Sequence, residues 1–261
     1  MFRNTPTVTQ NLIIVNILFF VATFVLEQQG VDLGTILGAH YFNTPLFKPW
    51  QLITHAFMHA DIFHIFMNMY VLFMFGSFLE RLWGAQRFLK VYFLSAFGAI
   101  LLYNIAGYFQ VEALINLIKS NGNGEQLTMI NNLLREFGKS DQFLEEANRY
   151  LNKDGGITSY QFAAISDYLG MSMTPMVGAS GAVFGLLAAF ALLFPNTELQ
   201  LLFPPIPVKA KYLIGGYFVL EIYSSFHQTA GDHVAHLAHV GGAIVGGVMV
   251  LIWKRNSSNF Y

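Results

Sequence analysis

Long apolar stretches separated by shorter polar connections dominate the chain. A membrane-spanning helix needs about 20 mostly apolar residues. The pattern predicts six of them, over residues 10–27, 61–79, 88–108, 177–194, 211–227 and 234–253. The fourth segment ends at Pro195 and the sixth at Lys254 and Arg255. The fold class that follows is an all-α polytopic membrane protein built as a bundle of six transmembrane helices.

One long polar stretch, residues 109–175, separates the third predicted span from the fourth. Apolar residues recur at intervals of three and four over 127–137 and 141–151, which predicts short amphipathic helices. We therefore expect a single membrane domain over 1–261 that carries 109–175 as an extracytoplasmic insertion of unassigned role. Residues 28–60 are rich in aromatics and predict a loop at the membrane interface.

Composition supports the membrane class and narrows the chemistry. The chain is 54% hydrophobic and 11% charged, whereas soluble domains carry about 25% charged residues. A net charge of -1 argues against a nucleic-acid partner. The absence of cysteine removes disulfides, thiolate metal sites and cysteine nucleophiles. Glu27, Gln28 and Gln29 follow the first apolar run where a signal peptide would show small residues, so this run is interpreted as an uncleaved first span.

The distribution of Lys and Arg in the short loops predicts the orientation of the chain. Lys48 lies in a short loop on the side opposite the termini. The other side carries Arg3, Arg81, Arg87, Lys90, Lys209, Lys211, Lys254 and Arg255. Both termini are therefore expected to be cytoplasmic. The short N-terminus lacks the Arg-rich and Ser-rich composition of a transit peptide, which favours a bacterial plasma (inner) membrane.

Polar residues inside the predicted spans gather at one depth. Such residues are costly in lipid and are functional candidates by default. His64 and Asn68 lie in the second span, Ser180 opens the fourth and His239 lies near the start of the sixth. Spans two, four and six begin on the same face of the membrane because successive spans alternate in direction. A serine, an imidazole and a pair of hydrogen-bond donors are the groups that acyl transfer needs.

Glycine spacing predicts how these groups meet. Gly181 and Gly185 give the fourth span a small-xxx-small face, and Gly242 and Gly246 give the sixth a matching one. If the two faces pack, Ser180 comes within hydrogen-bond reach of His239, which would take the serine proton and later release it to the leaving amine.

Neighbouring residues extend this interpretation. His64 and Asn68 are four residues apart and share one helix face, from which their N–H groups could point at an oxyanion. Phe184, one turn after the serine, could stack on the base. Asp232 is the acidic residue nearest His239 in the sequence, two turns away, which favours a serine–histidine dyad over a triad. Glu221, in the middle of the fifth span, is expected either to face the bundle interior or to be protonated, in a structural role.

These motifs resemble those of the rhomboid intramembrane serine proteases. The matching elements are Gly178-Ala179-Ser180-Gly181, the His64–Asn68 pair and His239-x-x-Gly242-x-x-x-Gly246. The resemblance implies a serine endopeptidase that cleaves transmembrane segments of other membrane proteins through an acyl-enzyme, without cofactor or metal. It assigns Ser180 as nucleophile, His239 as base, and His64 and Asn68 as oxyanion donors.

Two features of the sequence depart from the usual pattern of that family. Trp50-Gln51 resembles a first-loop motif in which family members often carry Trp-Arg, and the 109–175 insertion departs from compact members. Movement of the fifth helix is thought to admit substrate in the family, which would put 217–226 near a gate. The expected partners are the membrane and transmembrane protein substrates, with no nucleic acid; the oligomeric state stays open.

Two alternative functions remain. His55-x-x-x-His59 and His236-x-x-His239 have helical spacing that suits metal ligands, which would fit a metal-dependent membrane enzyme. That alternative leaves the Gly-Ala-Ser-Gly motif unexplained. A non-catalytic relative that binds membrane clients is the second alternative, although such a relative usually loses the serine or the histidine.

Overall fold

The computed structural model describes residues 5–151, 158–200, 206–227 and 234–256. The chain divides into two compact units. The first unit comprises Met1–Ala22, Ala56–Tyr103 and Gly178–Tyr261, and the second comprises Thr23–His55 and Asn104–Val177.

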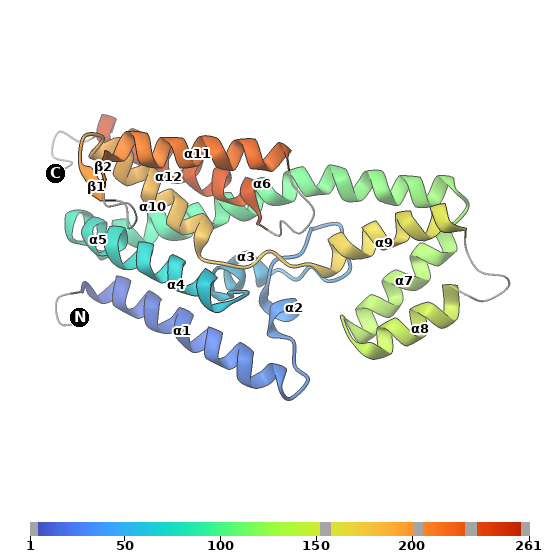
Figure 1. The fold of residues 1–261 in the computed structure, drawn as a ribbon. Helices are drawn as coiled ribbons and strands as arrows, with labels where there is room; N and C mark the ends of the chain where they lie inside the picture. The colour runs from blue at the N-terminus through green and yellow to red at the C-terminus, as the bar shows by residue number, and fades with distance from the viewer. Residues whose placement is uncertain (1–4, 152–157, 201–205, 228–233, 257–261) are drawn as a thin grey trace. The chain divides into compact units, whose positions relative to one another are not determined.

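Helices build the first unit (Figure 1). α4 (Ile62–Val71), a π-helical turn (Leu72–Gly76) and α5 (Ser77–Trp83) form one continuous rod. A two-stranded antiparallel hairpin, β1 (Glu198–Gln200) and β2 (Pro207–Lys209), pairs Leu199 with Val208. The remaining helices that contribute to this unit are α1 (Thr7–Glu27), α6 (Ala85–Ser120), α10 (Ser180–Leu193), α11 (Ala210–Phe226) and α12 (His236–Asn256).

Four helices in the described part of the chain are long and apolar enough to cross a membrane. They are Thr7–Glu27, Ile62–Trp83, Ala85–Ser120 and His236–Arg255, which correspond to the first, second, third and sixth predicted spans. The chain is therefore a polytopic helical membrane protein. The other two predicted spans are helices α10, of 14 residues, and α11, of 17 residues.

The third helix is longer than the sequence pattern indicated. We expected it over 88–108, but α6 continues to Ser120 into the predicted insertion. Its C-terminal part mixes apolar with polar residues and contains no proline, so nothing in the backbone forces an earlier stop. The helix ends where Asn121 is followed by Gly122, which has a φ of +82°.

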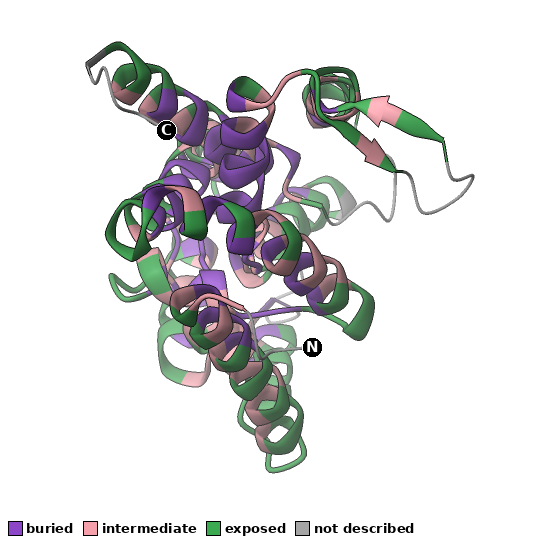
Figure 2. Ribbon diagram, turned by 90° about the vertical axis from the view of Figure 1, so that its left-hand side faces the viewer, coloured by how far each residue is buried: buried purple, intermediate pink, exposed green. Residues whose placement is uncertain are grey.

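Helix α10 is the most buried helix of the first unit. Ten of its 14 residues are buried, and Figure 2 shows buried positions on the inner sides of the helices and exposed positions on their outer sides. The helix packs against α12 and α11. Because α10 is surrounded by protein on most sides, its length need not match the apolar thickness that a lipid-facing helix must cross.

The N-terminus of α1 is fixed by a carboxylate from α5. The backbone N–H groups of Val8 and Thr9 donate to the Glu80 oxygens at 3.0 and 2.7 Å, and the Thr9 hydroxyl donates at 2.7 Å. The first turn of a helix leaves N–H groups unsatisfied and carries a partial positive charge. The buried Glu80 carboxylate accepts hydrogen bonds from these N–H groups, and its negative charge lies at the positive end of the helix.

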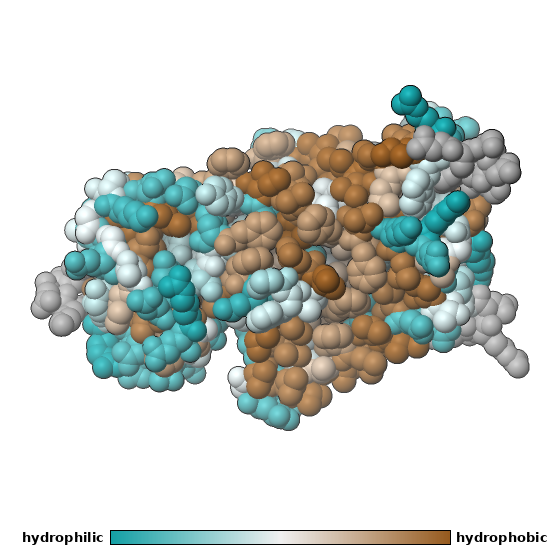
Figure 3. Space-filling model, turned by 180° about the vertical axis from the view of Figure 1, so that it is seen from behind, coloured by the Kyte–Doolittle hydropathy of each residue, from teal (hydrophilic) through white to brown (hydrophobic). Residues whose placement is uncertain are grey.

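The second unit has its own apolar core. Its helices are α2 (Leu33–Leu37), α3 (Gln51–Thr54), α7 (Gly124–Phe137), α8 (Asp141–Leu151) and α9 (Ser159–Met173). α7 and α8 confirm the amphipathic helices that the sequence predicted, and their apolar faces close on buried residues such as Ile130, Phe143 and Tyr168. In Figure 3 the surface of the apolar spanning helices is largely brown, and that of the region holding α7, α8 and α9 is largely teal.

The segment before α3 packs with the stretch predicted as an insertion. Ala39 and Met176 form a two-bond bridge, His40 Nδ1 lies 2.8 Å from the carbonyl oxygen of Ser172, and the Phe42 N–H donates to Asn104 Oδ1 at 2.8 Å. Residues 28–55 are therefore part of a folded unit. The sequence pattern had indicated only an interfacial loop.

Candidate active site

Ser180 is the first residue of α10 and follows a backbone turn that requires glycine. Gly178 has a φ of +127°, which side-chain-bearing residues rarely adopt. A Cβ atom placed there would lie 2.8 Å from His64 Nε2 and 3.4 Å from Ser180 Oγ. The absence of a side chain at Gly178 therefore lets the imidazole of α4 and the hydroxyl of α10 approach the same point.

The glycine faces of α10 and α12 are in contact, as the sequence predicted. A Cβ on Gly242 would lie 2.7 Å from the carbonyl carbon of Gly181, and a Cβ on Gly246 would lie 2.6 Å from the Cα of Gly185. Both distances are shorter than real Cβ atoms show, so no larger residue fits. The two backbones thus approach as closely as small residues allow.

This close approach brings Ser180 and His239 together. His239 Nε2 lies 2.9 Å from Ser180 Oγ, within hydrogen-bond distance. Phe184 stacks on the imidazole of His239, with ring centroids 4.3 Å apart and planes 7° from parallel, which confirms the expected stacking. Both His239 and Phe184 are buried, and Ser180 is half-buried.

His64 and Asn68 lie on α4 with different surroundings. The Ala60 N–H donates to His64 Nδ1 at 3.4 Å. Because a backbone N–H can only donate, the neutral ring carries its proton on Nε2, the atom that faces Gly178. Asn68 Nδ2 donates to the carbonyl oxygen of His64 at 3.0 Å. The structure therefore brings His64 beside Ser180, while the Asn68 amide hydrogen-bonds within its own helix.

The two other histidines near the start of α4 are buried. The His59 ring meets the His64 ring edge to face, with centroids 5.1 Å apart. His55 Nδ1 donates to the carbonyl oxygen of Gln51 at 2.8 Å within the second unit. His59 thus supports the His64 ring, and His55 closes a local turn.

Glu221 is a site residue whose partners the sequence analysis missed. Its Oε2 accepts hydrogen bonds from His239 Nδ1 at 2.8 Å and from His236 Nδ1 at 2.7 Å. Burial of Glu221 confirms the expectation that it faces the bundle interior. The available signal was an acidic residue in an apolar helix, which identifies a costly side chain but not its partner. Asp232 lies outside the described residues.

The same three side chains have the composition of a metal site. One ligand atom from each of Glu221, His236 and His239 lies within 4.8 Å of the others. A carboxylate and two imidazoles suit zinc and similar ions. One of these imidazoles also faces Ser180, so a metal there would share His239 with the serine.

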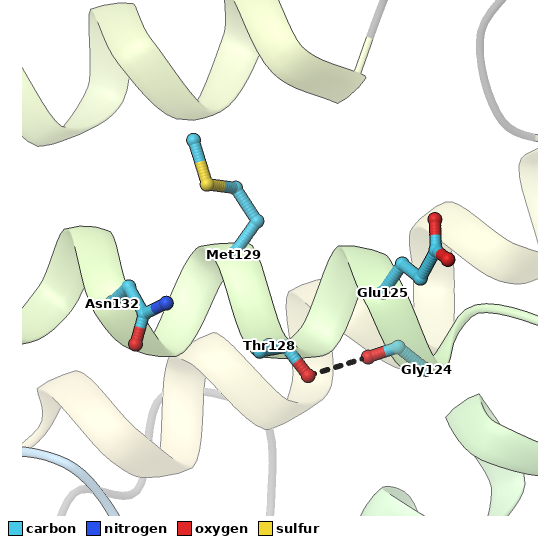
Figure 4. Close-up of a pocket in the computed structure, with 5 residues that line it drawn as sticks. All are labelled: Gly124, Glu125, Thr128, Met129 and Asn132. Carbon is cyan, nitrogen blue, oxygen red and sulfur yellow. Dashed lines mark hydrogen bonds between the residues drawn. The ribbon is translucent and has the colours of Figure 1, made fainter.

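A surface hollow on α7 offers no comparable chemistry. It is lined by Gly124, Glu125, Thr128, Met129 and Asn132, and the Thr128 hydroxyl donates to the Gly124 carbonyl oxygen at 2.8 Å (Figure 4). The hydroxyl is thus engaged by its own helix, and no imidazole lies among the lining residues. The hollow has no counterpart of the serine–histidine hydrogen bond between Ser180 and His239.

The fold and the site define a class: a polytopic helical membrane protein in which a serine and a histidine from two glycine-packed helices share a hydrogen bond. The Rhomboid domain family matches this chain over residues 46–111 and 150–256. The chain therefore belongs to the rhomboid family, whose members include proteases.

Curated relatives carry rhomboid names. The chain is 30% identical over 227 residues to an uncharacterized mitochondrial rhomboid protein of Schizosaccharomyces pombe, covering 84% of this chain and 55% of the relative. It is 27% identical over 248 residues to the mitochondrial RHOMBOID-like protein 12 of Arabidopsis thaliana, covering 95% and 58%. It is 32% identical over 91 residues to Rhomboid-like protease 1 of Toxoplasma gondii, covering 32% and 30%.

Two facts about these relatives bear on the sequence predictions. The chain spans just over half the length of the first two relatives. Both are named mitochondrial, as is Rhomboid protein 1 of Saccharomyces cerevisiae, which is 24% identical over 201 residues. These names conflict with the expectation of a bacterial plasma membrane, which rested only on the lack of a transit-like N-terminus. Location in a membrane is supported by the four spanning helices.

Proposed function

We propose that this protein is an intramembrane serine endopeptidase that cleaves transmembrane segments of other membrane proteins through a Ser180–His239 dyad. The observation that carries the proposal is the 2.9 Å separation between Ser180 Oγ and His239 Nε2. Nε2 must act as acceptor there, since His239 Nδ1 faces a carboxylate oxygen and holds the ring proton. The serine O–H therefore donates to the base that would remove its proton.

The reaction follows from this arrangement. Ser180 Oγ attacks a peptide carbonyl carbon while its proton passes to His239 Nε2. The tetrahedral intermediate collapses, the C–N bond breaks, and His239 gives the proton to the leaving amine. An ester of Ser180 remains. Water then loses a proton to His239 and attacks this ester, which releases the carboxyl product and restores the serine hydroxyl.

His64 and Asn68 are proposed as donors to the oxyanion. His64 supports this role best, because its protonated Nε2 lies beside the turn at Gly178 that precedes the nucleophile. The Asn68 amide has a second N–H besides the one that donates to the His64 carbonyl. Backbone N–H groups at the start of α10 add to the same positive region.

The proposal extends to the number of membrane spans and to their orientation. Six helices span the membrane, with the shorter α10 and α11 as the fourth and fifth. The 1–261 chain forms one rhomboid membrane domain, and 109–175 is an extracytoplasmic insertion within it. Both termini lie on the cytoplasmic side, where the Lys and Arg residues of the short loops gather. Substrate helices with small or helix-breaking residues expose their carbonyls more readily and should be preferred.

The test uses the full chain in mild detergent with a fluorogenic transmembrane peptide. Wild type should cleave it, and Ser180→Ala and His239→Ala should reduce cleavage to background. Ser166→Ala on α9 and His227→Ala at the end of α11 are matched controls at exposed positions and should retain wild-type rates. Full cleavage by Ser180→Ala would overturn the proposal.

A metal-dependent membrane enzyme is the second candidate, favoured by the clustering of Glu221, His236 and His239. The two candidates separate on one measurement. Cleavage by a serine protease continues in the presence of a chelator, whereas cleavage by a metal enzyme stops and returns when zinc is added. A client-binding relative would show neither cleavage nor labelling of Ser180 by a fluorophosphonate probe.

A further inference from the structure

Glu221 occupies an unusual position in α11. It is 4% exposed, whereas its apolar neighbours Leu220 and Ile222 are 60% and 37% exposed. The helix thus turns a carboxylate inward and leaves large apolar side chains on the outside. Burying a carboxylate is costly unless hydrogen bonds and opposite charge compensate for the lost hydration. The two imidazoles of α12 supply hydrogen bonds to the carboxylate here.

The hydrogen bond to Glu221 determines which ring nitrogen of His239 carries the proton. Glu221 Oε2 accepts from the Nδ1–H of His239 at 2.8 Å. A neutral imidazole carries one ring proton, so Nε2 is left with a lone pair, and that atom lies 2.9 Å from Ser180 Oγ. Serine, histidine and carboxylate therefore lie in one continuous line of hydrogen bonds.

We propose that Glu221 is a positioning residue that completes a Ser180–His239–Glu221 triad, and that His236 holds the carboxylate in place through a second hydrogen bond. This inference rests on the proposed protease function. The reacting groups remain Ser180 and His239. Glu221 keeps its negative charge throughout, fixes the tautomer and orientation of His239, and stabilises the imidazolium that forms when His239 takes the serine proton.

His236 has a supporting part in this arrangement. Its Nδ1–H donates to the same carboxylate oxygen as His239, at 2.7 Å, and its ring is buried. The two rings are nearly perpendicular, with centroids 6.4 Å apart. Two donors from one helix that converge on one oxygen restrict the rotation of the glutamate. His236 therefore keeps the carboxylate of α11 in line with His239.

The experiment compares Glu221→Gln, Glu221→Asp and Glu221→Ala with wild type in the detergent cleavage assay. Glu198→Gln on the exposed strand β1 is the matched control. Glu221→Gln keeps the size of the side chain but removes its charge, so kcat should fall by about 10²–10⁴, the range expected when a triad loses its carboxylate. KM should change little, since the residue does not touch substrate. Glu221→Asp should recover part of the lost kcat and Glu221→Ala none.

The pH profile distinguishes positioning from a structural role. The titratable groups that face His239 are Glu221 on α11, His236 on α12 and His64 on α4. The kcat of wild type should rise with pH, because general-base catalysis needs an unprotonated base. In Glu221→Gln this rise should move to lower pH, because the anion that stabilises the imidazolium is gone. A variant that merely loosened the fold would lower kcat without moving the profile.

A measurement on the native sequence covers the case in which the variants fail to fold. With ¹⁵N-labelled histidine, an Nδ1 proton bonded to a buried carboxylate should give a far-downfield proton resonance. His239 and His236 should each give one such resonance, because both Nδ1–H groups donate to Glu221. The resonance that is lost in His239→Ala should persist in His236→Ala and in Ser180→Ala. The absence of this resonance from wild type would overturn the proposal.

The remaining outcomes separate this inference from the proposed function. Wild-type kcat and an unshifted profile in Glu221→Gln would overturn the triad while loss of cleavage in Ser180→Ala still upheld the protease. Chelator-sensitive cleavage would overturn both, and would assign Glu221, His236 and His239 to a metal instead. Chelator-resistant cleavage with a shifted profile is the result that the triad requires.

Discussion

The imidazole of His239 lies flat against the ring of Phe184, with centroids 4.3 Å apart and planes 7° from parallel. Phe184 is one turn after Ser180 on α10, so the helix that carries the proposed nucleophile also supports the face of the proposed base. Phe184 in turn contacts Tyr217 of α11, at 5.1 Å between centroids. The ring of His239 is therefore fixed on its face by α10 and on its Nδ1 edge by α11.

Replacing Phe184 by leucine should lower kcat by up to about 10²-fold, because small misplacements of reacting groups carry penalties of that size. The change roughly conserves volume, so stability should fall by less than about 1.5 kcal/mol. Phe190→Leu is the control, since Phe190 is equally buried on α10 but contacts Phe75 and Phe78. Equal activity losses in the two variants would show that general packing, rather than support of His239, matters at Phe184.

Gly242→Ala should separate α10 from α12. The new methyl would meet the Gly181 backbone at 2.7 Å, and backbone cannot give way without moving a helix. We expect a loss of about 1–3 kcal/mol of stability from overpacking and loss of most activity. Gly247→Ala is the matched control, because its methyl would meet the end of the Leu192 side chain at 3.3 Å. Thermal unfolding and cleavage rates measured together test the pair.

His64→Ala should reduce kcat by about 10²–10³, the usual effect of removing one oxyanion donor. Asn68→Ala should reduce kcat by a similar factor if the second amide N–H of Asn68 reaches the oxyanion. Single-turnover rates on a peptide substrate measure both, with the melting temperature as a check on folding. Full activity in both variants would refute the proposed oxyanion site.

Glu80→Gln should destabilise the first unit without changing its chemistry. The carboxylate accepts three hydrogen bonds at the start of α1, and loss of its charge should lower stability by about 1–3 kcal/mol. The melting temperature should fall, while kcat per folded molecule should stay at the wild-type value. Glu198→Gln, at an exposed position, should leave the melting temperature unchanged.

The second unit should lose stability in mild acid through His40. Burial lowers the pKa of His40 from 6.5, more than its contacts with the Ser172 and Thr35 carbonyls raise it. Below pH 6.5 the unfolded chain therefore binds a proton at His40 that the folded unit does not bind. The contribution of His40 to the free energy of unfolding is thus fully present above pH 6.5 and is lost as the pH falls toward the lowered pKa. Unfolding of wild type and His40→Gln across this interval measures the effect, and equal pH slopes would contradict it.

The contact between α10 and α12 and the position of Phe184 could be predicted from helical periodicity. Two glycines spaced by four on each of two spans define a close contact, and that contact fixes the approach of Ser180 to His239. Phe184 follows from the same periodicity, since it lies one turn from the serine. These inferences needed only positions within a helix and one pairing of helices.

The features that the sequence did not predict depend on how separate elements pack. Glu221 meets His239 because α11 is rotated to face α12, and no spacing rule gives that rotation. The contact between His40 and Ser172 joins residues 132 positions apart, so residues 28–55 gave no local sign that they fold with α9. The extension of α6 to Ser120 was missed because Glu112, Asn116 and Lys119 interrupt the apolar run, while helix formation there required only the absence of a breaker.

The glycine contact between α10 and α12 sets the spacing of Ser180 and His239 without any lipid-facing side chain. Glycine has no rotamers, so the distance between these helices depends on backbone atoms alone. The outward-facing residues Ile244, Val248 and Leu251 lie on the other side of α12 and are exposed. Those positions can change to suit a thicker or thinner bilayer while Ser180 and His239 stay the same distance apart. The proposed Ser180–His239 dyad would thus suit membranes of different composition.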